Sequence, residues 1–192
     1  MIGQEFETLL ADARAGDEAA FARLWRDLNP ALLRYLALGE QAPEEVAAET
    51  WLGVVKGLRT FRGDEMAWRA WVFTTARRRA VDAARKRARE SRLGIRTTTW
   101  VAPLAPDCAE EVEQVLTTAE AIALVRRLPP LQAEVVLLRV VAELSVEEVA
   151  GLLGRSPGAV RVAAHRGLRA LSAMLAETGV TTGTFRTLRE VT

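Results

Sequence analysis

The stretch SVEEVAGLLGRSPGAVRVAAHRGLRAL, residues 145–171, constrains the fold more than any other part of the chain. Ser145 and Glu148 have the spacing of a capping box at the start of a helix. Gly154 can end that helix, because glycine adopts the left-handed conformation of a tight corner without steric cost. The Ser-Pro pair that begins at Ser156 can then cap a second helix, with proline at its first position. The pattern therefore predicts two short helices joined by a tight turn.

Two further positions have the spacing of a helix-turn-helix. Ala150 is small enough to let the two helices approach closely, and Val160 is placed to pack the second helix against the first. The outer face of such a second helix fits the major groove of duplex DNA. The residues expected on that face are Ser156, Gly158, Arg161, Val162 and His165, and those expected to reach phosphates are Arg155, Arg166 and Arg169. The alternative is an ordinary helical hairpin with a solvated basic face.

The rest of the chain shows the same helical periodicity. Asp17 can cap one helix, a second is expected over residues 43–58, and a long third over residues 66–90. The first helix is expected to carry Phe21, Leu24, Trp25 and Leu28 on one face, and the second to bury Val46, Trp51, Val54 and Val55. Many Ala, Leu, Val and Arg residues and few aromatic ones also favour packed helices over sheets. We therefore expect an all-α chain.

A segment without periodicity divides the chain. Residues 91–108 contain glycine, a run of threonines and prolines, which is typical of a linker. We expect two small helical domains joined by this extended linker, followed by a polar tail that is either disordered or a docking strip for a regulator. The expected boundaries are residues 1–90 for the first domain, 91–109 for the linker, 110–175 for the second domain and 176–192 for the tail.

Charge is sorted along the chain, although the net charge is only +1. Residues 77–92 hold eight basic side chains against two acidic ones, whereas residues 40–49 hold four acidic side chains and no basic one. A second acidic patch spans residues 107–113. Such sorting favours one surface for a polyanion and another for a basic protein.

The basic segment carries an aromatic residue within its charged face. At about 100° per residue, one narrow stripe of the helix collects Trp71, Thr75, Arg78, Asp82 and Arg89, flanked by Arg85 and Lys86. The residues expected opposite, on the core face, are Phe73, Ala76, Ala80 and Ala84. An aromatic ring among cations suits stacking on unpaired bases together with neutralisation of the backbone. The alternative is that Trp68 and Trp71 are core residues beside a solvated arginine face.

The chain offers little for catalysis or for metal binding. It has one histidine and one cysteine, no phosphate-cradling glycine loop and no metal-ligand spacing, so we expect no catalytic residue, no metal and no cofactor. The single cysteine, Cys108, excludes an internal disulfide. No apolar run approaches the length of about 20 residues that spans a bilayer, and the N-terminus lacks a signal peptide's apolar core. We therefore expect a cytoplasmic protein without membrane insertion.

Together these segments resemble the extracytoplasmic-function (group IV) sigma factors of bacterial RNA polymerase. Residues 44–89 are similar to region two of that family and residues 128–171 to region four, in the same order and with a Pro-containing linker between them. The resemblance implies a non-enzymatic protein that binds core RNA polymerase and directs promoter-specific transcription initiation. It also implies its partners: the clamp helices of the largest polymerase subunit, the flap, duplex and single-stranded promoter DNA, and an anti-sigma factor of the kind that holds many relatives.

The resemblance also assigns roles to residues. The acidic helix would dock on the clamp-helix coiled coil through Glu45, Ala48, Glu49, Trp51 and Leu52. The loop FRGDEMAW and the helix after it would melt and read the minus-ten element through Phe61, Arg62, Trp68, Trp71, Thr75, Arg77, Arg78, Asp82, Arg85, Lys86 and Arg89. The helix-turn-helix would read the minus-thirty-five element. The family often has Asp at the position of Glu45 and Gln at the position of Ala48, which concerns the details of polymerase docking. It commonly has Asn at the position of Arg78, so Arg78 contacts a base, a phosphate or neither.

Two other classes of function fit parts of the sequence. A free-standing transcriptional regulator would use residues 128–171 to bind duplex DNA without polymerase, but it leaves the acidic helix and the Trp-Arg stripe without a role. An interaction-only helical adaptor leaves the helix-turn-helix unexplained. The sigma-factor interpretation accounts for every unusual segment at once.

Overall fold

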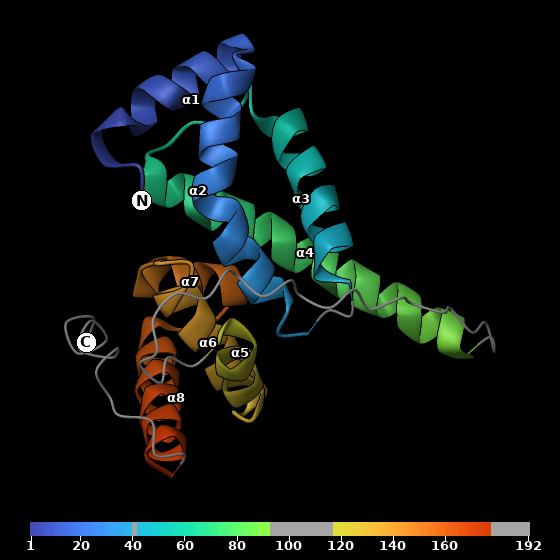
Figure 1. Cartoon of the computed structure of the whole chain (residues 1–192), viewed down its shortest axis with the longest axis vertical. Coiled ribbons are helices and arrows are strands. Elements are labelled where there is room, and N and C mark those ends of the chain that lie inside the picture. Colours follow the sequence, from blue (N-terminus) through green and yellow to red (C-terminus); the bar gives the residue numbers. More distant parts are fainter. Residues whose placement is uncertain (40–41, 93–116, 178–192) are drawn as a thin grey trace. The chain divides into compact units, whose positions relative to one another are not determined.

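The computed structural model describes residues 1–39, 42–92 and 117–177, and the regular elements in these ranges are all helices (Figure 1). They belong to two compact units, one within Met1–Thr99 and one within Trp100–Thr192. The prediction of an all-α fold with two helical domains is confirmed. The expectations for Cys108, for the acidic patch at 107–113 and for most of the linker and tail lie outside the described residues.

The first unit contains a short 3-10 turn and four α-helices, which are η1 (Gly3–Glu5), α1 (Phe6–Ala15), α2 (Glu18–Leu36), α3 (Pro43–Gly57) and α4 (Glu65–Arg92). Asp17 caps α2 as expected, because its carboxylate accepts hydrogen bonds from the backbone N–H groups of Ala19 and Ala20 at 2.7 and 3.0 Å. Asp64 caps α4 in the same way, since its Oδ1 accepts from the N–H of Ala67 at 2.8 Å. Both long helices expected from the sequence, α3 and α4, end within two residues of their expected bounds.

Side chains of α2, α3 and α4 build the core of this unit, and the fully buried ones include Leu24, Leu28, Val54, Val72 and Phe73. The expected burial is wrong for Val55, whose side chain is 49% exposed, and Trp25, expected on the face of Leu24 and Leu28, is 39% exposed. Each of these two follows a fully buried residue. One step along a helix turns a side chain by about 100°, which places both at the edge of the buried face rather than within it.

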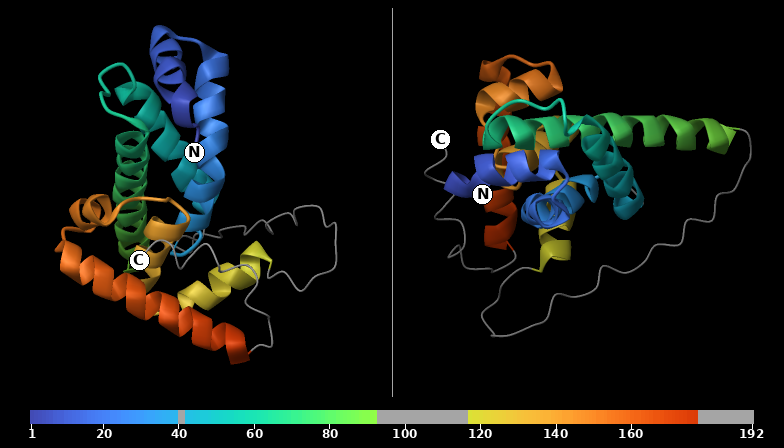
Figure 2. Two further views of the ribbon diagram at one scale, coloured as in Figure 1. Left: turned by 90° about the vertical axis from the view of Figure 1, so that its left-hand side faces the viewer. Right: turned by 90° about the horizontal axis from the view of Figure 1, so that it is seen from above.

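Only the first half of α4 contributes to the core. Its buried residues run from Trp68 to Ala76, and none beyond Ala76 is buried. The remaining turns extend beyond α2 and α3 (Figure 1, Figure 2). The expected core face therefore ends early, with Ala80 half-buried and Ala84 exposed, because neither neighbouring helix of the unit reaches that far.

Within residues 117–177, the described part of the second unit, there are four α-helices, which are α5 (Thr118–Arg126), α6 (Pro130–Val140), α7 (Val146–Leu153) and α8 (Pro157–Glu177). Val135, Leu138, Leu144 and Val149 are fully buried at its centre. Helices α6 and α8 lie close together at Gly167, where a Cβ atom would lie 2.7 Å from Cγ2 of Val136. This close approach sets α8 firmly on the unit and leaves its outer face free.

Candidate nucleic-acid and polymerase interfaces

The corner between α7 and α8 has the geometry that the sequence predicts. Ser145 Oγ accepts from the N–H of Glu148 at 3.1 Å, and Glu148 Oε2 accepts from the N–H of Ser145 at 2.7 Å, so the capping box is complete. Gly154 ends α7 in the left-handed conformation, with φ 62° and ψ 41°. The N–H of the next residue, Arg155, then donates to the carbonyl of Ala150 at 2.9 Å. These bonds fix the angle at which α8 leaves the turn.

Helix α8 is held on one side and open on the other. Ser156 Oγ accepts from the N–H of Ala159 at 3.2 Å and caps the helix, while Val160 and Ala150 are buried between α7 and α8. The residues expected to face DNA are all exposed: Arg155, Ser156, Gly158, Arg161, Val162, His165, Arg166 and Arg169. Val162 is 50% exposed, which is unusual for a valine and leaves an apolar contact surface among the cations. The second unit therefore offers a basic helical face with one apolar position.

Sequence reasoning missed one acidic member of this surface. Nη2 of Arg161 lies 3.1 Å from Oε1 of Glu147 in the first turn of α7. The two residues belong to different helices, so no helical spacing could have paired them. The angle of the turn brings them together.

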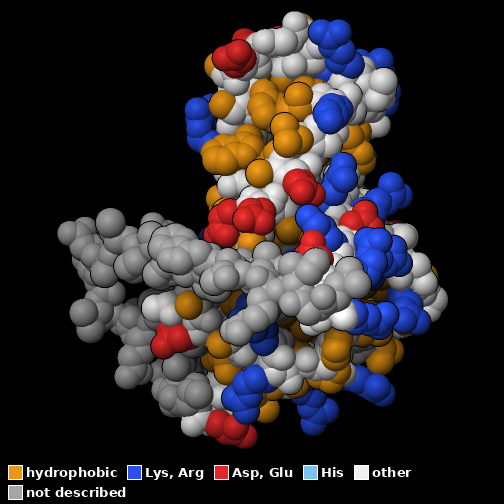
Figure 3. Space-filling view, turned by 90° about the vertical axis from the view of Figure 1, so that its right-hand side faces the viewer, with side chains coloured by type: hydrophobic (Ala, Val, Ile, Leu, Met, Phe, Trp, Pro, Cys, Tyr) orange, Lys and Arg blue, Asp and Glu red, His pale blue; other side chains and the backbone are white. Residues whose placement is uncertain are grey.

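The outer face of α3 combines carboxylates with apolar side chains. Glu45, Ala48 and Glu49 are exposed, and Leu52 is 61% exposed one turn further along. Val55, which was expected in the core, extends this strip by another turn. Figure 3, which views the chain from the right-hand side of Figure 1 where α3 lies, shows apolar side chains gathered on the upper part of the surface beside Lys and Arg.

Trp51 does not belong to that outer face. Its side chain is only 6% exposed, its Nε1–H donates to Oδ1 of Asn29 at 2.9 Å, and its ring meets Phe21 edge to face at 6.1 Å. The burial of Trp51 expected from the helical pattern is confirmed, whereas its assignment to direct polymerase contact stays a prediction that this burial does not support. Trp51 lies on the inner side of α3 and anchors the helix to α2.

Trp68 is likewise buried, and its assignment as a DNA contact stays a prediction that this burial does not support. Its side chain is 2% exposed, with ring centroids 6.4 Å from Phe6 and 5.5 Å from Phe61. A base cannot stack on a ring that is enclosed on both sides. The alternative given for Trp68 in the sequence analysis is the one that its burial supports.

Trp71 is half-buried and has a packing role as well as an open edge. Its ring stacks on Phe61 with centroids 4.9 Å apart and an interplanar angle of 16°. It also lies on Gly57 of α3, where a Cβ atom would come within 2.7 Å of the indole. Thr75, one turn later, donates its hydroxyl hydrogen to the carbonyl of Trp71 at 2.9 Å. The start of the expected stripe is therefore turned partly toward α3.

Beyond Thr75 the stripe opens to solvent. Arg78, Asp82, Arg85, Lys86 and Arg89 are exposed, and Arg77 is half-buried. Asp82 lies 3.8 Å from Arg85, and Lys86 lies 3.9 Å from Glu90, so the two acidic residues of the segment are each close to a cation. Arg62 in the preceding loop is exposed, yet its Nη1 donates to the carbonyl oxygens of Arg59 and Phe61 at 2.9 and 2.7 Å. The guanidinium thereby holds the loop in its turn.

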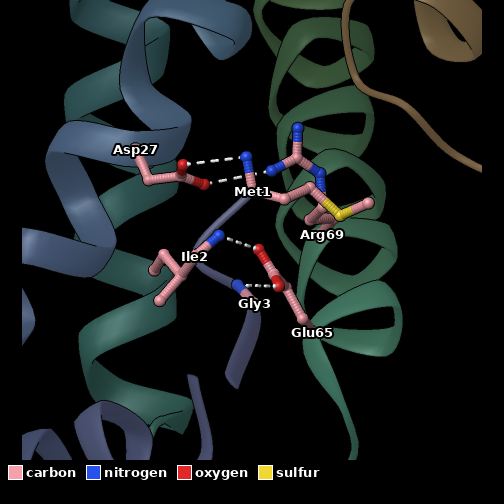
Figure 4. A network of polar contacts seen from close by, with 6 residues as sticks. All are labelled: Met1, Ile2, Gly3, Asp27, Glu65 and Arg69. Carbon is pink, nitrogen blue, oxygen red and sulfur yellow. Dashed lines mark hydrogen bonds and ion pairs between the residues drawn. The ribbon is translucent and has the colours of Figure 1, made fainter. Parts of the chain in front are cut away.

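A polar network lies behind this loop and was not found from the sequence (Figure 4). Arg69 on α4 is 3% exposed, and its Nη1 lies 3.0 Å from Oδ2 of Asp27 on α2. Glu65, the first residue of α4, accepts hydrogen bonds from the backbone N–H groups of Ile2 and Gly3 at 2.6 and 2.8 Å. The network ties the first three residues, α2 and the start of α4 together.

Within the described residues, no group of His, Cys, Asp and Glu could hold a metal ion, and no helix is long and apolar enough to cross a membrane. The carboxylate of Glu120, in the first turn of α5, accepts two hydrogen bonds from Thr117. The backbone N–H of Thr117, and then its hydroxyl, donate to the carboxylate of Glu120 and hold the pKa of that group below its usual range.

Comparisons with known proteins match both units. Residues 24–90 match the family described as Sigma-70 region 2, and residues 118–171 match Sigma-70, region 4. The chain is 30% identical over 181 residues to the ECF RNA polymerase sigma factor SigD of Mycobacterium tuberculosis, covering 89% of this chain and 84% of that one. It is 29% identical over 177 residues to the ECF RNA polymerase sigma factor ShbA of Streptomyces griseus, covering 86% of this chain and 93% of that one.

A solved structure has the same fold. The sigma factor RpoE in complex with the anti-sigma factor NepR, from Bartonella quintana, superimposes with a TM-score of 0.63 at 19% identity. The match covers 81% of this chain and 96% of that one.

Proposed function

Because this chain belongs to the extracytoplasmic-function sigma factors of bacterial RNA polymerase, we propose that its two units read the two halves of a promoter in different ways. The protein binds core RNA polymerase and directs promoter-specific transcription initiation. Its family is not a family of enzymes, and we infer that it does no chemistry of its own. The proposals below assign this function to residues.

The second unit reads the minus-thirty-five element as duplex DNA. The observation that carries this assignment is the fixed corner at Gly154 with the exposed face of α8 beyond it. Arg161 is suited to the two acceptors of a guanine edge, and Val162 to the methyl group of a thymine. Arg155, Arg166 and Arg169 lie at the borders of this face and neutralise phosphates, which positions the helix without reading sequence.

The first unit opens the minus-ten element. The exposed cations of α4 hold the backbone of the strand that leaves the duplex, and the loop from Phe61 to Asp64 receives an unstacked base. Phe61 is half-buried against Trp71, so the pair offers a rigid edge to such a base rather than two free rings. Trp68 supports both rings from within the core.

The outer face of α3 docks on the polymerase. Glu45 and Glu49 are complementary to a basic coiled coil, and Leu52 and Val55 supply the apolar contact that charges alone do not give. Trp51 acts through the position of the helix. The exposed apolar strip supports this assignment, because a valine and a leucine exposed on one helix indicate a partner surface.

We further propose that the working boundaries are 1–90, 91–109, 110–175 and 176–192, and that the protein acts in the cytoplasm, where its polymerase lies. An anti-sigma factor is a further proposed partner. The solved relative from Bartonella quintana was crystallised in complex with an anti-sigma factor, which supports the existence of such a partner for this chain.

The test is transcription in vitro with purified bacterial core polymerase, with and without this protein, on sheared genomic DNA of its source. Transcripts that start at a fixed distance downstream of a shared two-part motif are expected. Binding of duplex DNA by the protein alone, without initiation, would instead favour a free-standing regulator. The alternative would then leave the face of α3 without a partner.

A further inference from the structure

Glu65 joins the beginning of the chain to the beginning of α4. It directly follows the loop formed by residues 61–64, and both of its carboxylate oxygens are used, one by the N–H of Ile2 and one by the N–H of Gly3 (Figure 4). Hydrogen bonds to an ionised carboxylate are stronger than bonds between neutral groups. The first residues of the chain therefore form a strap across the start of α4, with Glu65 as its attachment point.

A second carboxylate secures the same strap from the other side. Asp27 of α2 lies 3.0 Å from Nη1 of the buried Arg69 and 3.3 Å from the Met1 nitrogen. Arg69 lies one helical turn beyond Glu65, so both attachments act on the first two turns of α4. A buried guanidinium requires such a partner, which makes the position of α4 against α2 strongly defined.

The loop that the strap supports also has attachments of its own, among them backbone hydrogen bonds from Phe61 to Gly57 and Leu58. Asp64 caps α4, Arg62 bonds only to carbonyl oxygens within or beside the loop, and Phe61 stacks on Trp71. Phe6, at the other end of the strap, packs against Trp68 beneath that stack. The strap and the aromatic cluster thus hold the loop from two sides.

We propose that Glu65 is a positioning residue for promoter opening. By bonding the strap, it fixes the start of α4 and with it the loop that receives the unstacked base. The inference rests on the proposed function of the first unit and deepens it. Displacement of a positioned group by about 1 Å can lower a rate by as much as a hundredfold. Both bonds of Glu65 go to Ile2 and Gly3 rather than to α3, so we expect its loss to act on opening rather than on docking.

The experiment compares full-length Glu65→Ala and Glu65→Gln in holoenzyme with a matched control, Asp17→Ala. The Asp17 carboxylate also accepts two backbone N–H bonds in the same unit, at 2.7 and 3.0 Å, but both come from its own helix α2. The control therefore removes a similar pair of bonds without releasing the loop. Opening is followed by permanganate reactivity of unpaired thymines, and base selectivity by binding of single-stranded oligonucleotides that differ at the captured position.

Glu65→Ala is expected to slow opening about tenfold or more and to lose base selectivity, with core binding and closed-complex formation unchanged. Glu65→Gln keeps one acceptor oxygen and should recover part of both. Asp17→Ala should also lower the melting temperature, because it removes the cap of α2, yet it should open promoters like the unaltered protein. The inference is overturned if Glu65→Ala opens normally, or if both alanine variants lose opening in proportion to their stability. If the unaltered holoenzyme initiates nowhere, the proposed function itself fails and the inference falls with it.

Discussion

Arg161 on α8 is held by Glu147 on α7, with 3.1 Å between the guanidinium and the carboxylate, so an ion pair spans the corner of the helix-turn-helix. Both side chains are more than half exposed, at 61% and 66%, and an ion pair of that kind contributes only about 0–1 kcal/mol to stability. Its larger effect is on the orientation of the Arg161 side chain. The carboxylate restricts where the guanidinium points before DNA arrives.

Arg161→Ala is expected to weaken binding of the minus-thirty-five duplex by about 1–3 kcal/mol and to relax the preference at one base pair. Electrophoretic mobility shifts of the holoenzyme on promoter variants would measure both effects. Arg127→Ala removes the same charge from the end of α5 and should leave the preference intact. If Arg161→Ala instead abolished assembly with core polymerase, its assignment to DNA would be wrong.

Glu45→Lys with Glu49→Lys should weaken binding to core polymerase, because two cations would then face the basic coiled coil. Co-purification with tagged core polymerase is the measurement. Glu7→Lys with Glu18→Lys is the matched control, since both residues are exposed on other helices of the same unit. Undiminished co-purification of the α3 variant would remove α3 from the docking surface.

Trp71→Ala is expected to slow promoter opening more than closed-complex formation. Removal of a fully buried tryptophan costs about 3–5 kcal/mol, and the half-buried Trp71 should cost less. Trp71→Phe keeps a ring on Gly57 and Phe61 and should retain most of the stability while opening at an intermediate rate. Stopped-flow fluorescence with a labelled promoter separates the two steps. If Trp71→Ala unfolds and Trp71→Phe opens the promoter at the normal rate, Trp71 is a core residue only.

Gly167→Ala should destabilise the second unit by about 1–3 kcal/mol, because the added Cβ would lie 2.7 Å from Val136 and force α6 and α8 apart. Gly151→Ala is the control. It lies in α7 with open space around its Cβ position, and it should be neutral or stabilising by about 0.5–1 kcal/mol. Calorimetry of the full chain would distinguish them, and equal melting temperatures would contradict the close approach.

The first turn of α5 is expected to lose stability in acid, because Glu120 is part of its capping box. The folded state lowers its pKa, so the charged carboxylate stabilises the capping box above the ordinary value of 4.5. That stability is lost as the pH falls from 4.5 through the lowered pKa. The protection factors of the α5 amides against hydrogen exchange should fall over this window, and Glu120→Gln should flatten the dependence. An unchanged pH dependence in the variant would show that the bond to Thr117 does not matter.

Local spacing was enough to predict the caps and the corner. Ser145 and Glu148 lie three residues apart, and Gly154 acts through its own backbone, so neither needs a distant partner. The same holds for Asp17 and its two amides on the first turn of α2. These features came out as expected because a helix terminus is completed by its neighbours in sequence.

Burial of the tryptophans depended on tertiary packing instead. Trp51 was expected in the core, but Trp68 and Trp71 occupy helical faces that periodicity alone leaves open. Phe6 of α1, Phe61 and Gly57 of α3 are the neighbours outside α4 that cover these two rings. The bonds in Figure 4 join residues 62 or 63 positions apart for Glu65 and 42 apart for Arg69. No pattern within one helix could have indicated them.

The arm of α4 beyond Ala76 has no buried residue, and it carries eight cations against two anions. A helix of this length without packing is marginal in water, and repulsion among its charges lowers its stability further. Salt should therefore act on it in two opposite directions. It screens the repulsion and lengthens the free helix, while it also competes with nucleic acid for the same arginines. Promoter phosphates would neutralise the cations of residues 77–92 and thereby stabilise this part of the helix. Part of the binding free energy is then used to order the arm, and the measured affinity is lower by that amount.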